Sequence, residues 1–313
     1  LVAAWLKRLK VASDTDIGGV PLSELLTSDL EIMTPSRELI RGVELVAENE
    51  ELTAVVKSQD KGLLEKYLWG KDSLDLLNLC PNISFDVAKL VSWLKPLQHR
   101  AYSISSSPKA HKNEVHLTVA AVRWDYENRS HKGVCSTFLA DNVPVGEQAG
   151  IFMSPNKSFR VPEDDTVPMI MVGPGTGVAP FRAFLEERRE RSASGTNWLF
   201  FGDQHRECDF IYEDEISTFS ETGLLTRLDL AFSRDQADKV YVQHRLIENG
   251  KDIYSQLENG GHFFVCGDAT RMAKDVDKAL HTIIENHGKH DQDTAIEYVN
   301  RLKLEKRYVR DVY

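Results

Sequence analysis

A glycine-rich turn carries the most specific chemical signal in the sequence. The apolar run 168–172 predicts a buried strand, and it leads through GPGTG at 173–177 into the apolar periodicity of a helix. Glycines let backbone N–H groups approach a pyrophosphate closely, and the positive end of a helix favours an anion. Because a strand precedes the turn and a helix follows it, we predict a phosphate cradle at Gly175, Thr176 and Gly177, with a merely tight turn as the alternative.

A second polar cluster follows the predicted strand 228–232. Its members are Ser233, Arg234, Lys239, Val240, Tyr241, Val242 and Gln243. Sites for NAD(H) usually place an acid on the ribose 2′-hydroxyl, whereas a 2′-phosphate needs cations. Arginine can bind such a phosphate with two hydrogen bonds, and lysine supplies a point charge. The cluster therefore predicts NADP(H) in preference to NAD(H), and a solvated charged turn is the alternative.

A third group combines a predicted strand at 100–106 with a glycine loop at 133–136. Arg100, Tyr102 and Ser103 offer a charge for a phosphate, a ring for stacking and a hydroxyl donor. Gly133 opens a short helical segment, which is again an anion-binding arrangement. These residue types alone do not define a complete binding site, and an edge strand with a buried tyrosine is the competing interpretation.

A lone cysteine ends the predicted strand 263–266. Cys266 is more simply explained by packing, but ligands of open α/β sheets lie beyond the carboxyl ends of strands, where this thiol is expected. Asp268, two residues on, is most simply a helix cap. No two of the four cysteines have the C-x-x-C spacing of a metal or dithiol site, so no metal is predicted.

The elements that must position these residues fall into three stretches. Residues 1–98 show helical periodicity, with a helix start at Pro35-Ser36, and predict a helical packing module. Alternating segments at 100–106, 114–122 and 149–153 predict strands. From 167 onward, strands at 168–172, 198–202, 228–232 and 263–266 alternate with helices at 178–191, 212–219, 242–248 and 272–287, which predicts a doubly wound parallel sheet.

Composition restricts the class of protein. With 313 residues and a net charge of −10, the chain lacks the basic surplus of a general nucleic-acid binder. No apolar run approaches the ~20 residues that span a bilayer, so no membrane partner is expected. Free thiols suit a reducing, cytoplasmic location. The first residues predict an amphipathic helix, not a signal peptide.

These motifs, in this order, resemble the reductase half of the diflavin reductases in the ferredoxin–NADP reductase superfamily. The resemblance covers nearly the whole chain and is strongest to the sulfite-reductase branch. It is carried by FFG at 200–202, SRDQADKVYVQ at 233–243 and the terminal RDVY at 310–313. Cytochrome P450 reductases are similar too, but they typically place a tryptophan near the flavin where this chain ends in tyrosine.

The resemblance implies three domains: a helical connecting subdomain at 1–98, a partial FAD-binding antiparallel β-barrel at 99–163 and a Rossmann-like NADP(H)-binding domain at 164–313. The positions that match the family's flavin site are Arg100, Ala101, Tyr102, Ser103, Thr118, Val119, Ala120, Trp124, Gly133, Val134, Cys135 and Ser136. Asp275 is a further expected contact to NADP(H), beside the 233–243 cluster. The barrel of the family begins with strands that precede the helical insertion, whereas this chain starts inside the insertion. We therefore expect either a truncated fragment or strands supplied from elsewhere.

The resemblance also implies a mechanism, in which hydride passes from nicotinamide C4 to flavin N5. Ser103 would bind near N5, Cys266 would line the nicotinamide pocket and Asp311 would stabilise positive charge on the nicotinamide. Tyr313 would stack on the flavin and swing away, as a gate. Electrons would continue through a separate FMN-binding, flavodoxin-like domain to a haem/iron–sulfur acceptor, the sulfite reductase beta subunit. Alternatives are a nitrate- or P450-reductase type of module, or a flavin-free scaffold fragment.

Overall fold

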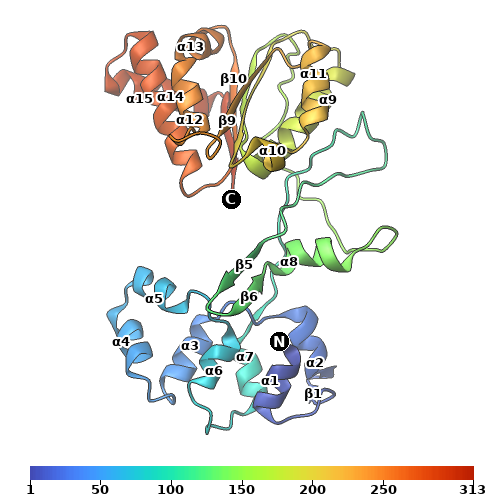
Figure 1. The fold of residues 1–313 in the computed structure, drawn as a ribbon, viewed down its shortest axis with the longest axis vertical. Coiled ribbons are helices and arrows are strands. Elements are labelled where there is room, and N and C mark those ends of the chain that lie inside the picture. Colours follow the sequence, from blue (N-terminus) through green and yellow to red (C-terminus); the bar gives the residue numbers. More distant parts are fainter. The chain divides into compact units, whose positions relative to one another are not determined.

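The computed structural model describes residues 1–313, and the chain divides into two compact units (Figure 1). Unit 1 comprises Leu1–Arg100 and Ala121–Val145, and unit 2 comprises Ala101–Ala120 and Gly146–Tyr313. The segment Ala101–Ala120 therefore makes its contacts with the C-terminal part of the chain. Each unit is described below by itself, and the predicted division into three domains stays a prediction.

Unit 1 is mainly helical, as the periodicity of residues 1–98 predicts. Its helices are α1 (Val2–Leu9), α2 (Leu22–Glu24), α3 (Arg37–Glu44), α4 (Glu50–Ser58), α5 (Lys61–Leu68), α6 (Ser73–Asn78), α7 (Val87–Trp93) and α8 (Val134–Thr137), with π-helical turns η1 (Leu25–Asp29) and η2 (Phe138–Asn142). Its strands form short antiparallel pairs: β1 (Asp16–Ile17) with β2 (Val20–Pro21), β3 (Leu30–Glu31) with β4 (Lys95–Pro96), and β5 (Arg123–Tyr126) with β6 (Arg129–Lys132).

Side-chain caps fix where several of these helices begin. The hydroxyl of Ser36 accepts a hydrogen bond from the N–H of Leu39, which confirms the predicted start of α3. Asp72 and Asp75 form a capping box at the start of α6. A cap of this kind stabilises a helix by about 1 kcal/mol. The apolar faces behind the caps bury Leu39 and Leu77 completely in one core.

The β5–β6 hairpin belongs to the helical module because of two local contacts. Arg129 of β6 forms an ion pair with Asp72, at 2.6 Å, and another with Asp75, so it binds both carboxylates of the capping box. The ring of Tyr126 packs so closely on Gly70 that a Cβ at that position would lie 2.1 Å from it. Any larger residue at Gly70 would displace the hairpin.

Unit 2 is built on a five-stranded parallel sheet. Its strands are β7 (Met169–Val172), β8 (Asn197–Asp203), β9 (Arg227–Phe232), β10 (His262–Gly267) and β11 (Tyr308–Val312). They lie in the order β11-β10-β7-β8-β9, and all four pairings are parallel. The chain moves outward from β7 through β8 to β9, then returns to the other side of β7. The strand order therefore reverses between β7 and β10.

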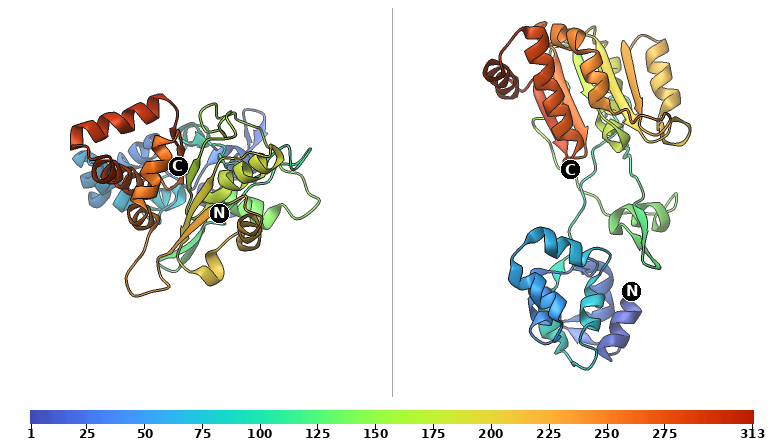
Figure 2. Two further views of the ribbon diagram at one scale, coloured as in Figure 1. Left: turned by 90° about the horizontal axis from the view of Figure 1, so that it is seen from above. Right: turned by 60° about the vertical axis from the view of Figure 1, so that its left-hand side comes forward.

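Helices cover both faces of this sheet, as the doubly wound prediction requires. They are α9 (Ala179–Glu190), α10 (Arg206–Asp209), α11 (Glu213–Glu221), α12 (Val242–Glu248), α13 (Gly250–Glu258), α14 (Met272–Gly288) and α15 (Gln292–Leu304), with a 3₁₀ turn η3 (Gly175–Val178) before α9. In Figures 1 and 2 the orange and red helices, α12 to α15, gather on one side of the sheet, and α9 and α11 lie on the other. The predicted strands and helices of this part are confirmed to within a few residues, whereas α10, α13 and α15 were not predicted.

Alternating side chains of the strands divide the core between the two faces. In β7, Ile170 and Val172 pack with α12 to α15, whereas Met169 and Met171 pack with α9 and α11. All four are completely buried. A strand that is buried on both faces has a continuous run of apolar residues, so the sequence pattern predicted β7.

The predicted barrel strands differ from the structure. Of the segments 100–106, 114–122 and 149–153, the first two share one isolated bridge, between Ile104 and Leu117, and the third has irregular backbone. Alternation shows that a segment suits a sheet, but a strand forms only where a neighbour completes its ladder of hydrogen bonds. Along 149–153 no strand lies alongside, and Ile151 and Met153 are exposed. None of the helices combines the length and apolarity that a membrane crossing requires.

Candidate functional site

The point where the strand order reverses brings the glycine turn to the end of β10. Gly177 lies so close to β10 that a Cβ there would be 2.2 Å from the carbonyl oxygen of Cys266. Gly175 adopts a positive φ of 55°, a left-handed conformation that favours glycine. The crevice beyond the carboxyl ends of strands at such a reversal is where open α/β sheets bind ligands.

The start of the helix after the turn is open to an anion. No side chain caps η3 or α9, and Pro180 at the start of α9 has no N–H to satisfy. The first N–H groups of a helix need partners from outside it, and they carry partial positive charge. Gly175, Thr176 and Gly177 therefore form a turn whose shape and charge suit a phosphate group.

Three polar side chains predicted from distant parts of the sequence meet beside this turn. The register of β10 and β11 sets Cys266 next to Asp311, and the hydroxyl of Ser103 donates a hydrogen bond of 2.7 Å to the Asp311 carboxylate. Cys266 is completely buried. Burial, aided by the nearby Asp311 charge, raises the pKa of its thiol to about 12, and the neighbouring Ser103 hydroxyl opposes that shift. Cys266 is therefore a neutral thiol at physiological pH.

The C-terminal residue is fastened at the same place. The N–H of Tyr313 donates to the carbonyl of Gly267 at 3.1 Å, and its own carbonyl accepts from Ala269. Its hydroxyl lies 3.0 Å from the hydroxyl of Thr176. Tyr313 is 58% exposed and lies next to the glycine turn.

Asp268 has the local role that its sequence context suggests. Its carboxylate accepts hydrogen bonds from the N–H groups of Thr270, Arg271 and Met272 and from the Thr270 hydroxyl. These bonds hold the pKa of Asp268 far below its usual range. All of its strong interactions are used to begin α14, so the carboxylate is a cap.

The residues predicted for a 2′-phosphate lie after β9. Ser233 is nearly buried, whereas Arg234 and Lys239 are exposed, and neither cation forms an ion pair. The acid in the same turn, Asp235, accepts from the N–H of Arg206 and pairs with His205, which together lower its pKa. In this turn the positive charges of Arg234 and Lys239 therefore have no ion-pair partner, whereas the carboxylate of Asp235 is bound by its neighbours.

The rest of this cluster surrounds the start of α12. Tyr241 precedes the first helical residue, Val242, and its ring is partly exposed. The side-chain amide of Gln243 donates to the carboxylate of Asp275 on α14, at 3.4 Å. Val240 packs against the core at the edge of the cluster. The structure thus brings together residues that lie 32 positions apart in the sequence.

The residues predicted for the flavin divide between the two units. Those in unit 1 are Arg100, Trp124, Gly133, Val134, Cys135 and Ser136, and those in unit 2 are Ala101, Tyr102, Ser103, Thr118, Val119 and Ala120. In unit 1, Trp124 stacks on His131, with ring centroids 5.0 Å apart, and Gly133 precedes α8 without a side-chain cap. In unit 2, the Thr118 hydroxyl lies 2.8 Å from the hydroxyl of Tyr212.

Sequence reasoning missed Asp203, at the end of β8. One of its carboxylate oxygens would lie 3.4 Å from a Cβ at Gly175, so it borders the glycine turn. Burial, together with the charge of Asp209, raises the pKa of Asp203. A single aspartate after an apolar run gave no signal, because only the pairing of β7 with β8 places it beside the turn.

Comparison with known proteins gives the same two parts. The FAD binding domain family matches residues 7–138, and the oxidoreductase NAD-binding domain family matches residues 171–278. The chain is 44% identical to the sulfite reductase (NADPH) flavoprotein alpha-component of Vibrio cholerae over 93% of its own length and 47% of that protein. It is 42% identical to the protein of the same name from Yersinia enterocolitica over 100% of its length and 51% of that protein. The chain thus spans about half the length of the curated relatives it matches.

The chain matches an FAD binding domain family and then an oxidoreductase NAD-binding domain family, the two domains of the ferredoxin–NADP reductase class. Within this class it is a homologue of the flavoprotein alpha-components of sulfite reductase. The predicted resemblance is confirmed.

The buried thiol predicts a pH dependence of stability. The folded-state pKa of Cys266 lies above its ordinary value of 9.0, so the unfolded chain loses this proton first as pH rises. The stabilisation is complete below pH 9 and is lost on the way to pH 12, by up to about 1.4 kcal/mol per pH unit. We expect the free energy of unfolding, measured in urea, to fall less steeply between pH 9 and 11 in Cys266→Ala than in the unsubstituted chain. Parallel slopes would contradict the assignment, and Cys135→Ala, a thiol that is not fully buried, is the control.

Proposed function

We propose that the chain is the FAD- and NADPH-binding part of a flavoprotein reductase of the sulfite-reductase type. One observation carries the proposal: Ser103, Cys266 and Asp311 meet at the reversal of strand order, beside a glycine turn suited to a dinucleotide. Both family matches and the identity to sulfite reductase alpha-components support it. When bound, NADPH supplies a hydride that FAD accepts and passes on as single electrons.

The choice of nucleotide follows from the charges after β9. Arg234 and Lys239 are exposed cations without ion-pair partners, and Asp235 is engaged by His205 and Arg206. A ribose 2′-hydroxyl would find no available acid in this turn, whereas a 2′-phosphate would find two cations. Ser233, Tyr241, Gln243 and Asp275 complete the proposed site, and the pyrophosphate would bind at the turn formed by Gly175, Thr176 and Gly177.

The residues proposed to hold FAD also fit its chemistry. Arg100 offers a cation, and the uncapped start of α8 at Gly133 offers N–H groups, both suited to phosphates. Tyr102 and Trp124 offer rings, and Ser103 offers a hydroxyl. The remaining proposed contacts are Ala101, Thr118, Val119, Ala120, Val134, Cys135 and Ser136. We also propose the division into residues 1–98, 99–163 and 164–313, with the middle part as the segment that contacts FAD.

The chain's own residues would prepare the reacting groups. Ser103 is held by Asp311, so its hydroxyl has a fixed orientation. Asp311 remains able to stabilise positive charge, and Cys266 lines the site as a neutral, buried thiol. Tyr313 would cover the flavin ring and leave when nicotinamide arrives.

The downstream partners are proposed from the relatives' names. An alpha-component of sulfite reductase implies another component, for which we propose the haem/iron–sulfur beta subunit, reached through an FMN-binding domain. The identities favour this acceptor over a nitrate- or P450-reductase type. Four free thiols support a cytoplasmic location.

Flavin content tests the proposal directly. We expect the purified chain, incubated with FAD and desalted, to retain FAD and show flavin absorption bands in the blue and near-ultraviolet. We expect NADPH to bleach the blue band without oxygen. A chain that stays colourless under all FAD concentrations would overturn the flavin assignment in favour of a flavin-free scaffold fragment.

The cations after β9 should discriminate between the two nucleotides. Replacing Arg234 and Lys239 by alanine removes charge-assisted hydrogen bonds worth about 1.5–3 kcal/mol each to a phosphate. We therefore expect the Kd for NADPH to rise at least about tenfold, with the Kd for NADH nearly unchanged. Titration calorimetry measures both. The control replaces Lys251 and Lys278, two exposed lysines elsewhere in unit 2. Equal losses for NADPH and NADH would refute the 2′-phosphate site.

Removing Tyr313 should relax discrimination against NADH. A stacked aromatic pair is worth about 0.5–1.5 kcal/mol beyond its buried area, so the ratio of kcat/KM for NADPH over NADH should fall about threefold to tenfold. Steady-state kinetics with both nucleotides measures this ratio. Tyr313→Phe is the matched control, because it keeps the ring and loses the hydroxyl that contacts Thr176. An unchanged ratio after deletion would rule out the gate.

A further inference from the structure

The segment that carries Ser103 has almost no sheet of its own to hold it. One isolated bridge, Ile104 to Leu117, links its two arms, and it includes the backbone bond from Ser105 to His116. Nevertheless Ser105, Ser106 and Ser107 are almost completely buried. Buried backbone without a ladder must find its hydrogen bonds elsewhere, so the partners of these serines show what fixes the segment.

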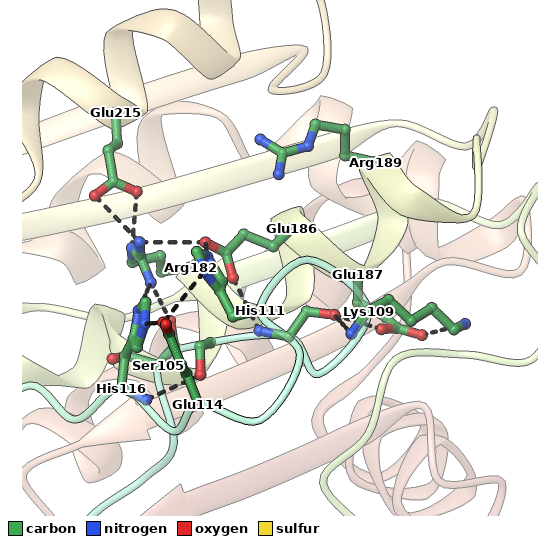
Figure 3. Close-up of polar contacts among 12 residues, drawn as sticks. Ser105, Lys109, His111, Glu114, His116, Arg182, Glu186, Glu187, Arg189 and Glu215 are labelled. Carbon is green, nitrogen blue, oxygen red and sulfur yellow. Dashed lines mark hydrogen bonds and ion pairs between the residues drawn. The ribbon is translucent and has the colours of Figure 1, made fainter.

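The partners that lie outside the segment 101–120 come from one helix, α9. Arg182 donates to the carbonyl of Ser105 at 2.7 Å. Glu186, one turn later, accepts from the N–H of Ser107 at 2.8 Å, and Glu187 accepts from the Ser107 hydroxyl at 2.7 Å. Arg182 and Glu186 also form an ion pair with each other, at 3.2 Å. Figure 3 shows these carboxylates and the guanidinium directed at the segment.

Arg182 is the centre of this network, because all of its N–H groups have acceptors. The Nε–H group and one Nη2–H bind the carboxylate of Glu215 on α11, at 2.8 and 3.2 Å. The second Nη2–H faces Glu186, and the Nη1 group serves both the Ser105 carbonyl and Nδ1 of His116, at 3.3 Å. The guanidinium also stacks over the Tyr212 ring, 5.1 Å from its centroid. Its planar fork of five donors cannot be reproduced by another side chain.

A metal site is the competing explanation for part of this cluster. His111, Glu114 and His116 place three potential ligand atoms within 4.8 Å of one another. However, Arg182 donates to Nδ1 of His116, so the ring proton lies on Nε2, which faces Glu114 at 3.0 Å. A metal on Nε2 would force a proton onto Nδ1, against the guanidinium. The geometry favours hydrogen bonding within the protein.

We propose that Arg182 is a positioning residue: with Glu186 it holds residues 101–107 on α9, and thereby keeps Ser103 against Asp311 and Cys266. The same helix begins at the glycine turn, so the turn and the hydroxyl are fixed to one rigid element. The positional effect on hydride transfer rests on the proposed function, whereas the attachment of the segment to α9 does not.

Amide hydrogen exchange tests the attachment without any ligand. In Arg182→Gln we expect a peptide covering 101–118 to exchange at least about tenfold faster, while a β10 peptide covering 262–267 keeps its protection. Arg189→Gln is the matched control, because Arg189 lies on the same helix, is 49% exposed, and contacts Glu190 and the Phe219 ring but not the segment 101–107. Figure 3 shows it apart from the network. Unchanged exchange in 101–118, or equal acceleration in β10, would overturn the proposal.

Two further measurements keep the test decisive. If Arg182→Gln does not fold, Arg182→Lys replaces it. We then expect an intermediate acceleration of exchange, because lysine keeps the charge but cannot reach Ser105 and Glu215 together.

In the FAD-loaded chain, Arg182→Gln should slow flavin reduction at saturating NADPH by about tenfold to a hundredfold, with KM for NADPH within about twofold. An unchanged rate would overturn the positional role of Arg182. If the unsubstituted chain shows no flavin reduction, the proposed function fails, and the exchange experiment still decides the attachment.

Discussion

The pairing of β10 between β7 and β11 is the constraint on which the rest of unit 2 depends. It brings the carboxyl ends of three strands to one edge and leaves no room for a side chain where Gly177 meets the carbonyl of Cys266. The same pairing sets Asp311 beside Cys266 and fastens Tyr313 to Gly267. A one-residue slip of β11 would turn Asp311 toward the opposite face of the sheet and break its contact with Ser103.

Polar chemistry, not a strand ladder, joins the segment 101–120 to this sheet. A guanidinium that is 10% exposed is stable there because two carboxylates, a carbonyl and a ring nitrogen accept its N–H groups. Removing one member of such a buried set leaves the others without partners, which is far more costly than losing a surface ion pair. The network explains why a segment that alternates like a strand belongs to unit 2 without forming one.

Some charged side chains of unit 2 are bound by neighbouring groups, and others have no ion-pair partner. The carboxylates of Asp268 and Asp235 accept hydrogen bonds from backbone N–H groups. The bonds to Asp268 stabilise the start of α14, and the bond to Asp235 holds the turn after β9. Arg234 and Lys239, by contrast, are left without ion pairs. An acidic chain can therefore present local positive charge to a phosphate, because its nearest acids are already satisfied. Net charge alone could not have revealed this.

The sequence by itself determined the local elements and the identity of the chemical groups. Apolar runs predicted the strands that are buried on both faces, and caps such as Ser36 predicted where helices begin. The strand and helix on either side predicted the glycine turn. Each of these predictions depends only on residues that are close together in the sequence. The barrel strands were predicted from alternation that no neighbouring ladder completes, and Arg182 and Asp203 gave no signal. Only the tertiary structure decided which residues meet: Ser103 reaches Asp311 across 208 positions because the register of parallel strands and the packing of α9 are set by contacts between distant segments.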